Sequence, residues 1–190
     1  GASYARQAGL EIARGYYLLN ADSDSIYPVT WVDTMVENLK DKSISCVYGT
    51  YSFIPSSGSR FNLSIYELFA RTMFAIKRRQ RECVNVMGFN FAFRREDAIN
   101  VGGYRHDLDR QATKRCEDGW MALCLMKYGK LKLLENTEVK VWTSDRRLLA
   151  DGSIGKAFVN RIKKELSRIL MYFDQSIKKD IKENDCRSKT

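Results

Sequence analysis

Two aspartates, Asp22 and Asp24, stand one residue apart directly after the bulky run Tyr16 to Leu19. Carboxylates this close repel each other, and each resists ionisation in a site of low dielectric unless something offsets the repulsion. A bound Mg²⁺ or Mn²⁺ would do so, because both cations take carboxylate oxygens and complete their shell with water and substrate phosphates. The alternative is a turn whose carboxylates cap the helix after Pro28. The pair therefore predicts either a metal site for a phosphate-bearing substrate or a capping turn.

A second acidic pair, Glu117 and Asp118, stands directly before the segment Gly119 to Lys130, which has helical spacing. The positive end of a helix keeps a carboxylate ionised, and an ionised carboxylate at a ligand cleft can act as a general base. The alternative is that the pair only caps the first turn of this helix.

Two glycine positions indicate places where backbone and ligand can come close. Gly88 begins the stretch GFNFAFRRED, and Gly102 and Gly103 form a Gly-Gly turn after it. A residue without a Cβ leaves room where a side chain would obstruct the approach.

Composition narrows the function classes. The 190 residues are 44% hydrophobic and 29% charged, which is typical of one globular domain with a sizeable core. The net charge of +9 favours an anionic partner. The basic residues are dispersed along the chain, so nucleic-acid binding is a disfavoured hypothesis and a phosphorylated small molecule or an anionic membrane surface is preferred.

Histidine and cysteine usage argues against other chemistries. His106 is the only histidine, so a Ser/His/Asp triad or a histidine-rich metal site has little support. The five cysteines form no C-x-x-C pair, which predicts reduced packing thiols and a cytoplasmic protein rather than a zinc site or a disulfide framework. No apolar run is long enough to cross a bilayer.

The elements that must position the acidic pairs alternate between helical and strand patterns, which predicts an α/β layer fold. Helices are expected at Ser3–Arg14, Trp31–Leu39, Arg60–Gln80, Gly119–Lys130 and, amphipathic and basic, Ile154–Ile181. Strands are expected at Tyr16–Leu19, Ile44–Ile54, Val84–Phe93 and Leu131–Trp142. Asp22 and Asp24 then follow the carboxyl end of a strand, where open α/β sheets bind ligands.

In their order and separations, four segments resemble the family 2 glycosyltransferases of the GT-A fold. The segments are SYARQAGLEIARGYYLLNADSDSIYPVTWV, GFNFAFRREDAINVGGY, CEDGWMALCLMKYGK and VWTSDRRLLADG, which together extend from Ser3 to Gly152. The resemblance implies a GT-A-like (Rossmann-like) mixed sheet flanked by helices. It also implies an inverting, metal-dependent transfer of a sugar from a nucleotide-sugar donor to an acceptor hydroxyl of a glycan or lipid-linked molecule.

The resemblance assigns roles to individual residues. Asp22 and Asp24 would hold Mg²⁺ or Mn²⁺ on the donor diphosphate, and Asp118, supported by Glu117, would take the proton of the acceptor hydroxyl. The remaining nucleotide-sugar contacts fall on Arg6, Gly88, Asn90, Arg146 and Arg147. Gln7 stands where the family usually has an asparagine, and a metal register with Asn20 and Asp22 is a less favoured alternative.

The resemblance also has a gap and leaves a competing function open. The family's opening strands, which grip the nucleotide base, have no counterpart here, so the sheet is expected to be incomplete on its amino-terminal side. We therefore expect a catalytic region over residues 1–152 and an amphipathic helix with a frayed tail over residues 153–190. Oligomerisation and contact with the inner face of a membrane are further expectations. A non-catalytic glycosyltransferase-like binding or scaffolding module is the alternative function.

Overall fold

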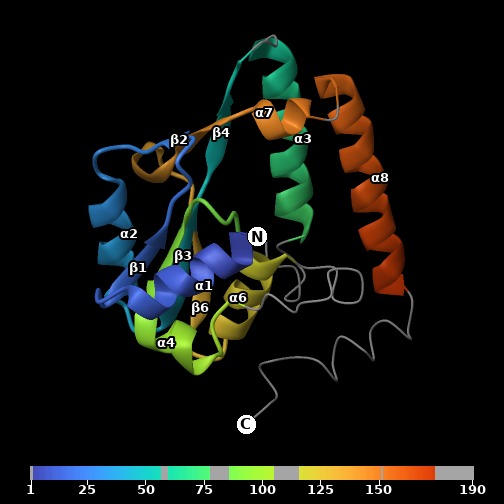
Figure 1. Ribbon diagram of the computed structural model, residues 1–190. Helices are drawn as coiled ribbons and strands as arrows, with labels where there is room; N and C mark the ends of the chain where they lie inside the picture. Colours follow the sequence, from blue (N-terminus) through green and yellow to red (C-terminus); the bar gives the residue numbers. More distant parts are fainter. Residues whose placement is uncertain (1, 57–59, 78–85, 105–115, 151, 174–190) are drawn as a thin grey trace.

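A computed structural model describes residues 2–56, 60–77, 86–104, 116–150 and 152–173. Strands form two sheets, with helices on both faces of the larger one (Figure 1). The strands are β1 (Tyr17–Asn20), β2 (Ser25–Ile26), β3 (Ile44–Gly49), β4 (Tyr51–Ile54), β5 (Phe91–Arg94), β6 (Lys130–Leu134) and β7 (Val141–Ser144). The helices are α1 (Ala2–Ile12), α2 (Trp31–Leu39), α3 (Arg60–Lys77), α4 (Arg95–Asn100), α6 (Glu117–Leu125), α7 (Arg146–Leu149) and α8 (Ile154–Phe173), with a short 3₁₀ turn η1 (Thr137–Val139).

The larger sheet has the strand order β1-β5-β3-β6. Strand β5 is antiparallel to both β1 and β3, and β3 is parallel to β6. The carboxyl ends of β1, β3 and β6 therefore meet at one edge of the sheet, together with the amino end of β5. This edge is where ligands bind in open α/β sheets. The smaller sheet has the strand order β2-β7-β4. In this sheet β2, the strand that follows β1 in the sequence, pairs with β7.

The period-two alternation of the strands divides the core between the two faces of the larger sheet. On one face, Cys46, Phe91 and Phe93 pack with residues of α1, α4 and α6. On the other face, Val47 and Ala92 pack with the buried side of α2 and with Val139 of η1. Neighbouring residues of β3 and β5 thus pack against helices on opposite faces of the sheet. Helices α1 and α6 both lie on the face of Cys46, Phe91 and Phe93.

Two of the predicted strands are each divided in the structure. The stretch Ile44–Ile54 forms β3 and β4, which belong to different sheets and are separated at Thr50. Gly49 lies so close to Asn90 and to the carbonyl of Val139 that a Cβ would not fit, so the chain leaves the larger sheet at this point. The stretch Leu131–Trp142 likewise divides into β6 and β7 around η1. Alternation in sequence does not reveal such a change of sheet.

Other boundaries move by a few residues. In the described part of the predicted strand Val84–Phe93, which begins at residue 86, β-structure starts only at Phe91 and runs to Arg94, because Gly88–Asn90 form a turn. Helix α6 begins at Glu117 and ends at Leu125, earlier at both ends than predicted. The predicted ends of the helices after Lys77 and Phe173 lie outside the described residues.

The expectation that the cysteines are all reduced is wrong for Cys124, which is disulfide-bonded. Cys46 and Cys116 are free thiols. Disulfides are uncommon in reducing compartments, so the cysteines no longer support a cytoplasmic location.

Helices α3 and α8 lie side by side beyond β4 (Figure 1). The rings of Phe69 and Phe158 pack 4.9 Å apart between them. None of the described helices is long and apolar enough to cross a membrane.

Candidate active site

Pairing between β2 and β7 positions the loop that carries Asp22 and Asp24. Ser25 lies opposite Thr143, and its hydroxyl donates a hydrogen bond to Thr143 Oγ1 at 2.9 Å. The backbone N–H of Ser144 donates to the carbonyl of Asp24 at 3.2 Å. Because α7 begins two residues after Ser144, the same pairing brings Arg146 to the aspartates, although more than a hundred residues separate them.

Tyr27 fixes the other side of this loop. Its hydroxyl accepts a hydrogen bond from the backbone N–H of Asp22 at 2.8 Å and donates one to the carbonyl of Phe89 at 2.9 Å. Burial raises the pKa of Tyr27, so its hydroxyl keeps the proton that it donates. Tyr27 therefore ties the aspartate loop to the turn before β5. No motif in the sequence marks Tyr27 as a site residue.

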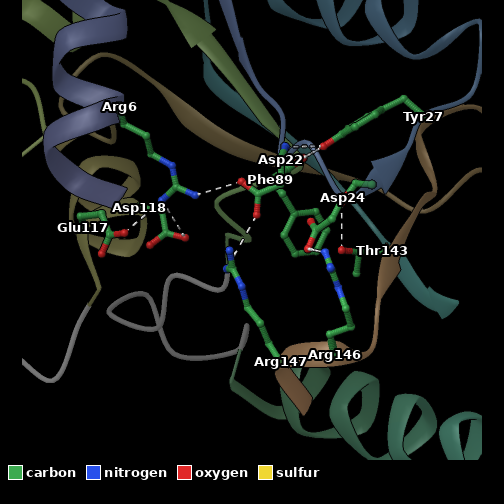
Figure 2. A network of polar contacts seen from close by, with 11 residues as sticks. Arg6, Asp22, Asp24, Tyr27, Phe89, Glu117, Asp118, Thr143, Arg146 and Arg147 are labelled. Carbon is green, nitrogen blue, oxygen red and sulfur yellow. Dashed lines mark hydrogen bonds and ion pairs between the residues drawn. The ribbon is translucent and has the colours of Figure 1, made fainter. Parts of the chain in front are cut away.

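Arg6 joins the two acidic pairs (Figure 2). Its guanidinium donates a hydrogen bond to Glu117 Oε1 at 3.1 Å and lies 3.6 Å from Asp22 Oδ1 and 4.0 Å from Asp118 Oδ2. Glu117 and Asp118 are both buried at the start of α6. The two acidic pairs, which are far apart in the sequence, thus lie within reach of one arginine side chain.

Gly88 packs against this centre. A Cβ at this position would collide with Asp118 Oδ2 and with both terminal nitrogens of Arg6. The close approach at Gly88 is made to the candidate base and to Arg6. The predicted approach of a ligand to Gly88 stays a prediction. The Gly-Gly turn behaves similarly, since Gly102 and Gly103 have φ values of +90° and +69° and a Cβ on Gly103 would meet Gln7.

Arg146 and Arg147 approach the aspartates from α7 (Figure 2). Arg146 Nη2 lies 3.3 Å from Asp24 Oδ2, and Arg147 Nη1 lies 3.9 Å from Asp22 Oδ2. Both arginine side chains are largely exposed, at 70% and 86%, so they are free to turn toward a bound anion. Such an anion would gain charge-assisted hydrogen bonds from two guanidinium groups.

The acidic and basic side chains of this cluster nearly balance in charge. Among the described residues it holds four carboxylates, of Asp22, Asp24, Glu117 and Asp118, against the guanidinium groups of Arg6, Arg146 and Arg147. No three His, Cys, Asp or Glu side chains in the described part of the chain form a complete metal cluster. Two carboxylates from the Asp22–Asp24 loop fit a site in which a diphosphate and water supply the other ligands.

Asn90 is fully buried and supports the turn before β5. It accepts a hydrogen bond from Trp31 Nε1 at 2.9 Å and donates to the carbonyls of Thr50 and Val139. These bonds connect the turn before β5 with α2, the β3–β4 break and η1. The predicted contact of Asn90 with the nucleotide sugar stays a prediction.

Two further residues support the site from outside the predicted set. Gln7 Oε1 accepts a hydrogen bond from the backbone N–H of Tyr104 at 2.7 Å, which gives the replaced asparagine position a role in holding the Gly-Gly turn. The hydroxyl of Tyr104 donates to Asn20 Oδ1 at 2.8 Å. The choice between the metal register with Asp22 and Asp24 and the one with Asn20 and Asp22 stays a prediction. Only the spacing of polar residues could have indicated these contacts, and that signal is weak.

Comparison with known proteins supports the family and the fold. The family described as "Glycosyl transferase family 2" matches residues 1–102, more than half of the chain. Glucosyl-dolichyl phosphate glucuronosyltransferase of Haloferax volcanii is 23% identical over 147 residues, which cover 74% of this chain and 47% of that protein.

Among solved structures, mannosyltransferase PcManGT from Pyrobaculum calidifontis, in complex with GDP-Man and Mn²⁺, has a similar fold. The TM-score is 0.50 at 17% sequence identity, and the match covers 86% of this chain and 44% of that chain. The chain thus spans less than half the length of each of these two proteins. The expected GT-A-like arrangement of mixed sheets and flanking helices is confirmed. The chain belongs to glycosyl transferase family 2.

Proposed function

We propose that this chain carries the catalytic centre of an inverting, metal-dependent glycosyltransferase that moves a sugar from a nucleotide-sugar donor to an acceptor hydroxyl. The observation that carries the proposal is the convergence on Arg6 of Asp22, Glu117 and Asp118. The reaction needs a group that neutralises the leaving diphosphate and a base for the attacking hydroxyl, and the two acidic pairs are the candidates for these tasks.

On the donor side, Asp22 and Asp24 would hold Mg²⁺ or Mn²⁺ against the diphosphate. The cation, when bound, neutralises charge that develops on the leaving group. Arg146 and Arg147 would turn from the aspartates to the diphosphate oxygens, because their exposed side chains are only loosely held. Arg6, which is more deeply buried, would stay in place and keep Asp22 oriented.

On the acceptor side, Asp118 would remove the proton of the attacking hydroxyl. The acceptor oxygen then forms a bond to the anomeric carbon while the bond from that carbon to the diphosphate oxygen breaks. Glu117 holds the shorter contact with Arg6, 3.1 Å against 4.0 Å for Asp118, so Asp118 is the carboxylate left more available to the acceptor. A single displacement of this kind inverts the anomeric configuration.

Candidate substrates follow from the relatives. One similar protein is named as a glucuronosyltransferase for a glucosyl-dolichyl phosphate, and another was solved with GDP-Man and Mn²⁺. For this chain we propose a nucleotide-sugar donor and a glycan or lipid-linked acceptor.

The test is a transfer assay with a panel of UDP-sugars and GDP-sugars, in Mn²⁺ and in EDTA. We expect release of nucleoside diphosphate from one donor class only when the metal is present. With an α-linked donor, the proton coupling constant of the new anomeric centre should report a β product. Metal-dependent nucleotide binding without any transfer would favour the alternative, a non-catalytic binding module, and release that is equal in EDTA would contradict the metal role.

Contact with a membrane surface is proposed from the outer helices. Phe61, Ile65 and Leu68 share one face of α3 and are 72%, 47% and 66% exposed, and Val159 and Leu166 are exposed on the neighbouring α8. We call these five residues the apolar ridge. The sequence of α8 has five Lys or Arg residues and one Glu. An apolar stripe beside basic side chains fits the surface of an anionic bilayer. The cytoplasmic side of the membrane and the oligomeric state remain predictions.

A further inference from the structure

A cavity of about 280 Å³ lies at the carboxyl ends of β3 and β6, bounded on its outer side by α3. The lining includes Tyr48, Tyr51, Arg71, Met87, Leu133 and Lys140. None of these residues belongs to the candidate catalytic cluster, so the cavity is a separate feature.

The cavity nevertheless borders the candidate base. Met87 lines it, and the next residue, Gly88, packs directly against Asp118. Tyr48 and Leu133 belong to the core on the sheet face that α6 covers. Along the order β1-β5-β3-β6, Asp22 follows β1, Gly88 precedes β5, and the cavity lies at the ends of the last two strands. The turn that contains Gly88, which contacts the candidate base Asp118, thus lies between the cavity and Asp22.

The acidic residue Glu67 does not cancel the positive charge of the cavity wall. Its buried carboxylate accepts hydrogen bonds from Ser52 Oγ, the backbone N–H of Phe53 and the guanidinium of Arg60. Arg60 lies 3.0 Å from this carboxylate, whereas Arg71 lies 3.9 Å away with its side chain half exposed. The carboxylate of Glu67 is therefore paired mainly with Arg60, and the guanidinium of Arg71 can also interact with a bound anion.

Lys140 adds a second cation to the same wall. Its Nζ lies over the ring of Trp142, 4.7 Å from the ring centroid. Burial and then the neighbouring Arg71 lower the pKa of Lys140, and Glu67 acts in the opposite direction. A bound anion would relieve this crowding of positive charge. Glu135 also lines the cavity, and its side chain is exposed just after β6.

From this geometry we infer that the cavity binds a phosphoryl group carried by the acceptor, between Arg71 and Lys140, with the carbon skeleton of the acceptor along Met87 and Leu133. That the phosphoryl group belongs to the acceptor rests on the proposed function. The presence of an anion site in the cavity does not depend on it. Arg suits phosphate oxygens through its planar fork, and Lys adds a point charge. Burial raises the pKa of Tyr51 to about 12, so its phenol remains a hydrogen-bond donor at the wall.

Trp142 provides a reporter that does not require activity. In protein labelled with 5-fluorotryptophan, the ¹⁹F signal of Trp142 is assigned with Trp142→Phe and followed during titration with inorganic phosphate, octyl phosphate or octyl β-glucoside. We expect octyl phosphate to shift this signal and the neutral glucoside to leave it unchanged. Tighter binding of octyl phosphate than of inorganic phosphate indicates a lipid-linked phosphate, and equal affinities indicate a polar phosphate ester.

Arg71→Gln and Lys140→Gln should each weaken octyl phosphate binding by about tenfold or more, as expected for loss of a charge-assisted hydrogen bond. Lys130→Gln removes the same charge at the opposite end of β6, where the side chain is exposed, and should leave the affinity unchanged. Arg71 is half exposed, so its variant should fold even if the variant of Lys140 does not.

Two results would overturn the inference. One is an affinity that is unchanged in Arg71→Gln, and the other is displacement of a metal-bound nucleoside diphosphate by octyl phosphate, which would place the anion at Arg146 and Arg147. Failure of the proposed function is seen separately, as the absence of metal-dependent nucleotide binding. Phosphate binding at the cavity can therefore stand or fall independently of it.

Discussion

Arg6 on α1 and Glu117 on α6 form a hydrogen-bonded ion pair, with 3.1 Å between Nη1 and Oε1. The two side chains are 17% and 7% exposed, so the pair is shielded from water on most sides. Since Arg6 also reaches Asp22, this contact sets the distance between the candidate metal loop and the candidate base.

Replacing Arg6 should therefore damage both stability and donor binding. Arg6→Gln leaves buried carboxylates without their cation, and the free energy of unfolding should fall by about 2 kcal/mol in a urea titration. Metal-dependent nucleotide binding should weaken as well. Arg14→Gln, on an exposed position just after α1, serves as the matched charge control. Equal stability of the two variants would show that Arg6 does not hold the centre together.

Removing one carboxylate of the metal loop should abolish metal-dependent binding of the nucleotide. Asp24→Ala leaves Asp22 as the single carboxylate of the loop, so the cation loses half of the protein ligands proposed for it and half of their negative charge. Calorimetric titration of UDP and GDP in Mn²⁺ measures the effect. The exposed Asp33→Ala on α2 should bind like the unchanged protein. If a folded Asp24→Ala protein binds the nucleotide as well as the unchanged protein, Asp22 and Asp24 form only a capping turn and no metal site.

Gly88 should tolerate no side chain. In Gly88→Ala the new methyl group meets Asp118 and Arg6, so transfer should fall by at least about tenfold through displacement of the candidate base. Gly9→Ala makes the same change on α1, where nothing lies within 4 Å, and should be neutral or slightly stabilising. Steady-state kinetics of both variants, with circular dichroism as a folding check, measure the difference. A Gly88→Ala enzyme as active as Gly9→Ala would mean that the close approach has no catalytic importance.

The hydrophobic pattern predicted that Asp22 and Asp24 follow the carboxyl end of a strand, and the structure has them after β1. That D-x-D, E-D and R-R lie together was implied only by the resemblance to family 2 glycosyltransferases, because the pattern does not say which helix packs beside which strand. The change of sheet at Thr50 could not be predicted, because Ile44–Ile54 alternates as one continuous strand and only the packing of Gly49 against Asn90 breaks it. Tyr27 and Gln7 act through hydrogen bonds to backbone groups, which leave no periodic signal in the sequence. Asn90 was assigned by position in a motif, and the structure gives its amide three partners in the core.

The apolar ridge predicts binding to anionic membranes. Leu68→Gln and Phe61→Gln should lower co-sedimentation with phosphatidylglycerol vesicles, because each removes exposed apolar area from α3. Val29→Gln is the control, since Val29 is 99% exposed but lies before α2, away from α3 and α8. Binding that is the same for neutral phosphatidylcholine vesicles, or that is lost equally in the Val29 variant, would argue against this surface.

The most direct test of the central claim is the single-turnover rate of Asp118→Asn with the preferred donor and Mn²⁺. A base positioned at the acceptor hydroxyl typically contributes about a hundredfold or more, and the asparagine keeps the shape of the side chain while it cannot accept the proton. We expect transfer to fall by about that factor with donor affinity retained, and Glu117→Gln to cost less. Transfer at an undiminished rate, or loss of donor binding as complete as in Asp24→Ala, would contradict the role of Asp118 as the base.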